Sequence, residues 1–385
     1  MTSSLESLAA FVAKHDGIND KRRLTELVVA EYDLVRDRSV YYCNDFAIRF
    51  SSAASLSFSN TVASLSRLQK YDERPFIVCL LTPTENHLLL ANTTLLKKIS
   101  HSSQALRENN IRGSFNGSDI ARELEGIQNI PENLSRLFNI HTEIGFDGNL
   151  ARLVEATNNI SPTGEKFAIT EAAAHQILAA PERAAAFVRS SEVKQLKNEL
   201  DSKVAKFTNE ILLAALIENG NVRGRVIEYL IAGDDERLRQ SLITALQGGS
   251  GGLPAFKTDN ALGDYTRIFD DYHTETDVKT KIMILNSNPK AYNLDKMLEF
   301  LSTDRSVFMF YFVGVDPGRI VDTVLVSIFQ ETLLGATITL KHWAGRNSRG
   351  VTQFEGKAVG QLIQNPEFEI NIEMAKEFLR RVLEL

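Results

Sequence analysis

The pattern of hydrophobic and polar positions predicts alternating helices and strands in the carboxy-terminal half of the chain. Helical periodicity at 222–231 and a polar helix reaching about Leu246 precede a glycine-rich loop at 248–252. Residues 265–269 then alternate and are rich in β-formers, and 276–285 reads as a second strand after a polar corner. The two segments are therefore expected to pair as a hairpin.

Beyond the hairpin, the pattern predicts a helix and two strands. The helix falls at 294–301, and strongly apolar strands follow at 307–315 and 320–329. A continuous apolar run such as 308–315 is typical of a central strand covered on both faces. Residues 220–385 are therefore expected to fold as an α/β domain, with a mixed central sheet flanked by helices.

Residues 1–160 predict a separate amino-terminal α+β domain. Helical spacing occurs at 24–36, and strands are expected at 39–50, 75–81 and 87–92. The serine-rich segment 51–70 keeps apolar residues at helical spacing, so we interpret it as a helix with a polar face.

Turn residues gather at 157–164 (TNNISPTG), which indicates a boundary between domains. After this boundary, 161–219 is almost continuously helical in composition. We expect this segment to form a helical layer that connects the two domains.

The composition is that of an ordinary globular protein. The chain has 385 residues, of which 43% are hydrophobic and 24% charged, enough for two domains with cores of their own. The first residues lack a basic region followed by an apolar core, and no apolar run approaches membrane-spanning length. Cys43 and Cys79 both lie in apolar, strand-like segments, which favours buried thiols in a reducing cytoplasm over a disulfide or a metal site.

The net charge of −6 argues against a protein that coats nucleic acid through its bulk charge. It does not exclude DNA as a substrate, because a nuclease needs only a local positive cleft and its metal-binding carboxylates make the total more negative.

The predicted hairpin carries the most specific chemistry of the chain. Asp264 stands at the start of its first strand and Asp277 within the second, so pairing brings both carboxylates to one edge of the sheet. Lys279, two residues after Asp277, points to the same face. Two carboxylates can hold Mg²⁺ and leave positions open for water and a phosphate oxygen. A neighbouring ammonium group can polarise or deprotonate the attacking water and offset charge on phosphorus. The pattern indicates a magnesium-dependent phosphodiesterase site.

Two alternatives stay open at this hairpin. Charged residues are common on solvated strand edges, and an Asp-x-Lys tripeptide alone occurs by chance in many chains of this length. Asp259, Asp270 and Asp271 compete for the role of first acid; we prefer Asp264 because it begins a strand and leaves enough chain for a turn. Glu275 has the same parity as Asp277, and it is either a supporting group or without a role.

The order of these elements, with Asp264, Asp277-Val278-Lys279 and the helix 224–230 (GRVIEYL), resembles the PD-(D/E)XK nuclease superfamily, and within it the type II restriction endonucleases. The resemblance covers about 220–340. This chain has Gly-Asp where Pro-Asp is common, and Asp rather than Glu as the second acid.

The resemblance implies hydrolysis of a DNA phosphodiester by metal-activated water in a bacterial cytoplasm. It implies these roles: Asp264 and Asp277 as ligands of Mg²⁺, the carbonyl of Val278 as a further ligand, Lys279 beside the nucleophile, and Glu228 as the helix acid near the metal. Cutting both strands of double-stranded DNA needs two active sites, so a homodimer that matches the symmetry of palindromic DNA is expected.

Two further segments have compositions suited to DNA contact. Residues 341–353 gather polar side chains around glycines, and we expect four of them to contact DNA: Arg346, Asn347, Arg349 and Gln353. Arginine matches guanine edges, and Asn or Gln matches adenine edges. Trp343, in the same segment, is expected to pack on the core. The basic segment 97–112 suits a phosphate backbone through Lys97, Lys98 and Arg112, and a solvated surface loop is an equal alternative.

Three functions therefore stay open from the sequence. The first is a site-specific DNA endonuclease whose amino-terminal domain helps in recognition. The second is another DNA nuclease, of repair or anti-phage defence, on the same core. The third is a non-catalytic nucleic-acid-binding protein whose acidic cluster is incidental.

Overall fold

The computed structural model describes residues 4–99, 113–161, 165–248, 252–254, 262–285, 287–342 and 347–385. It confirms a mixed α/β protein, and the chain forms two compact units. The first unit is Met1–Thr163; the second comprises the rest of the chain from Gly164, apart from a few residues around His342. Among the described residues, no helix combines the length and apolarity needed to cross a bilayer.

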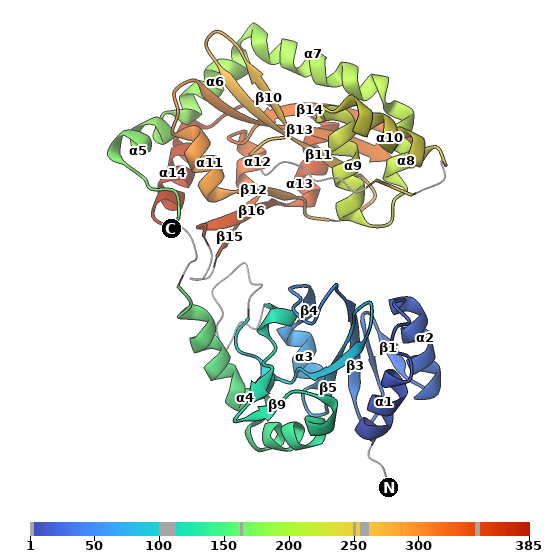
Figure 1. The fold of residues 1–385 in the computed structure, drawn as a ribbon. Coiled ribbons are helices and arrows are strands. Elements are labelled where there is room, and N and C mark those ends of the chain that lie inside the picture. Colours follow the sequence, from blue (N-terminus) through green and yellow to red (C-terminus); the bar gives the residue numbers. More distant parts are fainter. Residues whose placement is uncertain are drawn as a thin grey trace. The chain divides into compact units, whose positions relative to one another are not determined.

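The main sheet of the second unit has four strands in the order β10-β11-β13-β14 (Figure 1). β10 and β11 are antiparallel, β11 and β13 are parallel, and β13 and β14 are antiparallel. Their bounds are β10 (Tyr265–Ile268), β11 (His273–Ile282), β13 (Ser306–Asp316) and β14 (Arg319–Ser327). The predicted hairpin is present: Ile268 pairs with His273, so residues 269–272 make the corner.

Strand β13 is the centre of this unit because its side chains are apolar on both faces. Every residue from Ser306 through Val315 is buried. On one face, Phe310 and Phe312 pack against Phe354, with ring centroids 4.9 and 6.0 Å away. On the other face, the Tyr311 hydroxyl donates to Asp201 of α7 (Ser191–Lys206) at 2.7 Å. The continuous apolar run thus predicts a strand covered on both sides, and the structure confirms it.

Helices cover both faces of the β10-β11-β13-β14 sheet. α6, α7 and α8 lie against β13 and β14 on one face, and α11 and α13 lie against the other (Figure 1). The helices of this unit are α5 (Glu171–Leu178), α6 (Ala180–Arg189), α7 (Ser191–Lys206), α8 (Thr208–Ala215), α9 (Gly220–Ala232), α10 (Glu236–Leu246), α11 (Leu294–Leu301), α12 (Glu331–Gly335), α13 (Gly356–Gln364) and α14 (Ile372–Leu383). A second sheet, in the order β12-β16-β15, contains β12 (Lys290–Asn293), β15 (Thr337–Lys341) and β16 (Gly350–Phe354).

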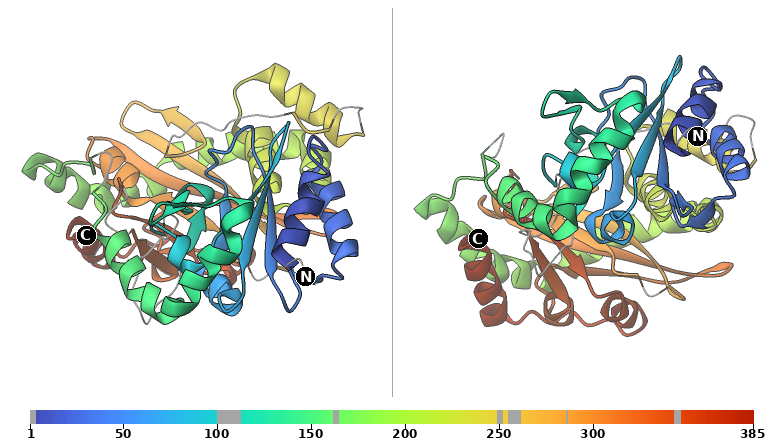
Figure 2. Two further views of the ribbon diagram at one scale, coloured as in Figure 1. Left: turned by 60° about the horizontal axis from the view of Figure 1, so that its bottom comes forward. Right: turned by 90° about the horizontal axis from the view of Figure 1, so that it is seen from below.

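The first unit has a five-stranded sheet in the order β1-β2-β3-β5-β6. Its strands are β1 (Val35–Asp37), β2 (Val40–Tyr42), β3 (Ala47–Ser52), β5 (Phe76–Leu81) and β6 (Asn86–Leu90). β5 is buried at every position, and its side chains alternate between two cores. Helices α1 (Ser4–Ala13) and α2 (Lys21–Glu31) pack into one core, and α3 (Leu65–Tyr71) into the other (Figures 1 and 2).

Helix α4 (Leu134–Asn158) contributes to both cores because it is kinked. Gly145, at φ 68° and ψ −176°, breaks the helical geometry. Leu137, before the kink, packs with α1 and α2, whereas Leu153, after it, packs with α3. Glycine suits this position because its φ is positive.

The interpretation of 51–70 as one helix is wrong. β3 continues to Ser52, β4 (Thr61–Ser64) pairs with β7 (Ser114–Asn116), and α3 begins only at Leu65. The apolar spacing of this segment fits a helix. Part of it forms a strand instead, because it pairs with β7, about fifty residues later in the sequence, and such tertiary pairing overrides local preference. The remaining short elements are η1 (Thr93–Leu95), η2 (Gly117–Asp119), β8 (Glu123–Leu124), β9 (Ile127–Gln128) and η3 (Pro131–Asn133).

Candidate functional site

Asp264 is fixed against strand β11 at two points. Its main-chain N–H donates to the carbonyl of Thr276 at 2.9 Å. Its carboxylate Oδ2 accepts from the main-chain N–H of Val278, also at 2.9 Å. These two contacts flank Asp277, so the first acid is held beside the second by the backbone of β11 itself.

Asp277 and Lys279 form a buried ion pair on one face of β11. Nζ of Lys279 lies 2.6 Å from Oδ1 of Asp277, and the two side chains are 17% and 7% exposed. The same Nζ lies 3.4 Å from the Val278 carbonyl oxygen and 3.4 Å from Oε1 of Glu228, on α9. The structure therefore brings together the four residues to which we assigned catalytic roles: Glu228, Asp264, Asp277 and Lys279.

The charges at this site do not balance. Burial raises the pKa of Asp277 well above its usual range; Lys279 opposes this, and Asp264 adds to it through its charge and a hydrogen bond. Burial also raises the pKa of Glu228, with Lys279 opposing and Asp264 adding. Burial would lower the pKa of Lys279, but the surrounding carboxylates, Asp277 foremost, hold it above its ordinary value. The ammonium group of Lys279 and, at Glu228, the charge of Arg225 thus act on three carboxyl groups, and a cation would relieve the repulsion that remains between them.

The donor set suits a hard cation. Among the described residues, no group of three or more His, Cys, Asp and Glu side chains is arranged to hold a metal ion. A cation at this edge would be held by Asp264, Asp277 and the carbonyl of Val278, with water in its other positions. Mg²⁺ is commonly bound in this way, through one or two carboxylates and several waters.

Arg349 lies elsewhere than we expected. Its side chain is 10% exposed and forms an ion pair with Asp295, which is equally buried. Its guanidinium group also donates to the carbonyl of Phe167 at 3.2 Å. The carboxylate of Asp295 accepts from the main-chain N–H of Phe167 as well, at 3.0 Å. Arg349 therefore joins three segments inside the second unit, and we no longer assign it to DNA contact.

The other residues expected at DNA belong to both units. Asn347 is exposed, and Gln353 is half-buried in β16, where it pairs with Ile338. In the first unit, Lys97 is exposed and Lys98 is half-buried. Arg346, Arg112 and Trp343 lie outside the described residues.

No sequence pattern singles out Gly263, which precedes the first acid. A side chain there would place Cβ 2.8 Å from the main-chain nitrogen of Thr276. Only glycine allows the chain to lie this close to β11. The Gly-Asp dipeptide, noted as a departure from Pro-Asp, therefore has a steric reason in this protein.

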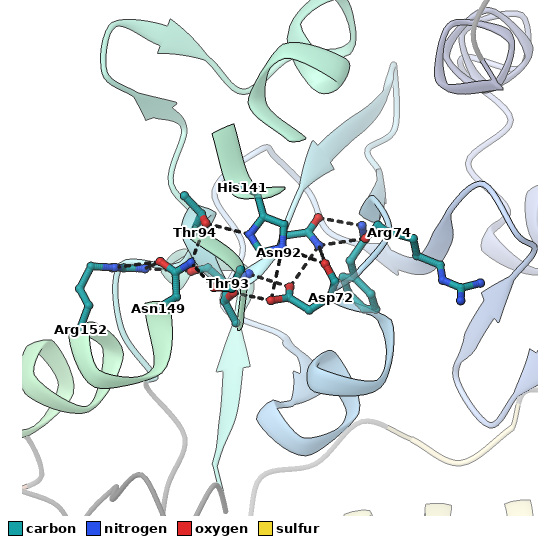
Figure 3. Close-up of polar contacts among 10 residues, drawn as sticks. Asp72, Arg74, Asn92, Thr93, Thr94, His141, Asn149 and Arg152 are labelled. Atoms are coloured by element: carbon teal, nitrogen blue, oxygen red, sulfur yellow. Dashed lines mark hydrogen bonds and ion pairs between the residues drawn. The ribbon is translucent and has the colours of Figure 1, made fainter. Parts of the chain in front are cut away.

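A second polar cluster lies in the first unit (Figure 3). The Thr94 hydroxyl lies 2.8 Å from Nδ1 of His141, and Nε2 of His141 lies 2.8 Å from the main-chain carbonyl oxygen of Asp72 and 3.4 Å from its carboxylate. This order of hydroxyl, imidazole and carboxylate is that of a nucleophilic triad. Asn149, however, donates to the same hydroxyl at 2.8 Å, and Thr94, His141 and Asp72 are 7%, 2% and 2% exposed. The cluster joins the two halves of α4 to the segment after β6, and we assign it to stability.

Comparison with protein-family models and with curated protein sequences gives no match to this chain.

Proposed function

We propose that this protein is a Mg²⁺-dependent endonuclease that hydrolyses phosphodiester bonds of duplex DNA at specific sites, in the manner of a type II restriction enzyme. One observation supports the proposal above the others. Asp264 is hydrogen-bonded to the backbone on either side of Asp277, and Nζ of Lys279 lies within ion-pair distance of both Asp277 and Glu228. Charged side chains on a solvated strand edge are mostly exposed. The side chains of Asp277, Glu228 and Lys279 are instead only 7%, 16% and 17% exposed.

The order of elements around the site supports the same proposal. Helix α9 supplies Glu228, the β10-β11 hairpin supplies the other acids and the lysine, and α11 then leads to β13, which lies parallel to β11. This is the arrangement on which the resemblance to PD-(D/E)XK nucleases rests.

In the proposed mechanism, Asp264 and Asp277 would hold the cation, and Val278 would contribute its carbonyl oxygen. Bound Mg²⁺ would supply Lewis acidity to a phosphate oxygen and lower the pKa of a coordinated water. Lys279 would hydrogen-bond the attacking water or a phosphate oxygen through Nζ, and its charge would offset the charge that develops on phosphorus. Glu228, 3.4 Å from Nζ, would hold the ammonium group in place.

A different nuclease on the same core is the second candidate. The acids and the lysine support phosphodiester hydrolysis in general. They do not distinguish a restriction enzyme from a repair or defence nuclease. The specificity in the proposal comes from the resemblance and from the presence of a separate first unit.

Cleavage products distinguish these candidates. The protein would be incubated with phage or plasmid DNA and Mg²⁺, and the ends of the products sequenced. Discrete fragments that share one end sequence support a site-specific enzyme, whereas nicks or a smear indicate a nuclease without sequence preference. Intact DNA under all conditions would favour the third function, a non-catalytic DNA-binding protein.

A further inference from the structure

The carboxylate of Glu275, on β11, is hydrogen-bonded to the segment that carries Asp264. Its Oε2 accepts from the main-chain N–H of Gly263 at 2.9 Å, and its Oε1 accepts from the Thr266 hydroxyl at 3.2 Å. Gly263 and Thr266 stand on either side of the Asp264-Tyr265 pair. Glu275 thus holds the chain just before and just after the first acid.

We propose that Glu275 is a positioning residue, which sets the place of the Asp264 carboxylate without binding the metal itself. This inference rests on the proposed function, because it gives Asp264 a cation to bind. Each carboxylate oxygen of Glu275 already accepts one hydrogen bond within the loop, Oε2 from Gly263 and Oε1 from Thr266.

The close approach of Gly263 to β11 is consistent with the same role. A Cβ at this residue would lie 3.0 Å from Oε2 of Glu275 and 2.8 Å from the main-chain nitrogen of Thr276. The chain is therefore pressed against β11 at the point where Glu275 binds it. From there, the main chain of Asp264 reaches the Thr276 carbonyl at 2.9 Å. Glu275, Gly263 and Asp264 form one continuous hydrogen-bonded attachment to the strand.

The position of a ligand carboxylate affects metal affinity, because a ligand held by hydrogen bonds from neighbouring residues binds a metal better than a mobile one. Loss of an outer hydrogen-bonding partner typically costs about 10- to 100-fold in metal affinity or activity. We expect a loss of this size when Glu275 is removed. It should appear as a higher requirement for Mg²⁺, with cleavage recovering as Mg²⁺ is raised.

Two substitutions separate positioning from metal binding. Glu275→Ala removes both hydrogen bonds. Glu275→Gln keeps an amide oxygen for the Gly263 N–H and an amide N–H₂ that can donate to the Thr266 hydroxyl, but it removes the charge. Glu299→Ala, which removes an exposed glutamate of α11 in the same unit, is the matched control.

The experiment measures Mn²⁺ binding to the full chain by electron paramagnetic resonance, and DNA cleavage as a function of Mg²⁺ concentration. The expected result is a 10- to 100-fold weaker Mn²⁺ affinity and a matching rise in the Mg²⁺ requirement for Glu275→Ala, roughly the range for loss of an outer partner. Glu275→Gln and Glu299→Ala should remain close to the unsubstituted protein.

Each other outcome overturns the inference in a distinguishable way. If Glu275→Gln is as defective as Glu275→Ala, the carboxylate charge is what matters and Glu275 is a metal ligand. If Glu275→Ala lowers the melting temperature but leaves Mn²⁺ affinity and Mg²⁺ requirement unchanged, its role is structural only. If the unsubstituted protein neither binds Mn²⁺ nor cleaves DNA, the proposed function fails, and the inference fails with it.

Discussion

The carboxylate of Asp264 accepts a hydrogen bond from the main-chain N–H of Val278 at 2.9 Å, one residue beyond Asp277. The two acids of the candidate site are therefore positioned by the same strand rather than by separate loops. Any change in the register of β11 would move both together.

Asp264→Asn should abolish or strongly reduce cleavage while preserving the fold. The amide oxygen of Asn can still accept from the Val278 N–H, but the neutral side chain is a poor ligand for Mg²⁺. Asp264→Ala should lose the hydrogen bond as well and destabilise the protein by about 1–3 kcal/mol. Cleavage assays and urea denaturation of the two variants check this. Full activity of Asp264→Asn would transfer the role of first acid to another residue.

Lys279→Met should lower the rate of cleavage by about 100- to 1,000-fold, the usual effect of removing one donor to a developing charge. Methionine keeps the apolar length of the side chain in a position that is 17% exposed, but it carries no ammonium group. Single-turnover cleavage rates measure the effect. Lys357→Met on α13 is the control; equal rates for both variants and the unsubstituted protein would remove Lys279 from the mechanism.

Arg349→Ala should destabilise the second unit and leave the DNA affinity of the folded protein unchanged. Removing the guanidinium group leaves Asp295, itself 10% exposed in its side chain, without its cation. Breaking a buried ion pair in this way costs about 3–5 kcal/mol. Urea denaturation and DNA-binding titrations check both halves of the prediction. Weaker binding with unchanged stability would restore Arg349 to the DNA interface.

Thr94→Val should destabilise the first unit without affecting the site on β11. The substitution leaves Nδ1 of His141 and one N–H of Asn149 without their shared hydroxyl (Figure 3). A buried polar group left unsatisfied costs about 1–3 kcal/mol. Thermal unfolding measures the loss, and Thr142→Val, at an exposed position of α4, is a matched control. Equal melting temperatures for the two variants would mean that the cluster contributes little to stability.

Where local pattern and tertiary packing agree, the sequence predicts the structure well. The run of residues in β13 is apolar throughout because both of its faces are covered, and the alternation in β10 marks a strand at the sheet edge. Successive side chains of a strand point to opposite faces, so Asp277 and Lys279 lie on one face of β11. Their contact could therefore be predicted.

The errors arise where a distant residue decides the outcome. Segment 51–70 has helical spacing, but Thr61–Ser64 pairs with Ser114–Asn116, and no local pattern reveals this partner. The residues around Arg349 have a composition that suits a DNA-reading loop. Arg349 instead forms an ion pair with Asp295, 54 positions earlier in the chain. The role of Glu275 stayed open for the same reason, since parity gives the face of a side chain but not its partners.

The central claim is tested most directly by comparing the unsubstituted protein with Asp277→Asn on duplex DNA in the presence of Mg²⁺. Our account predicts that the unsubstituted protein cleaves the DNA, that EDTA stops cleavage, and that Asp277→Asn is folded but inactive. Cleavage by Asp277→Asn at the unsubstituted rate, or cleavage that EDTA does not affect, would contradict the account.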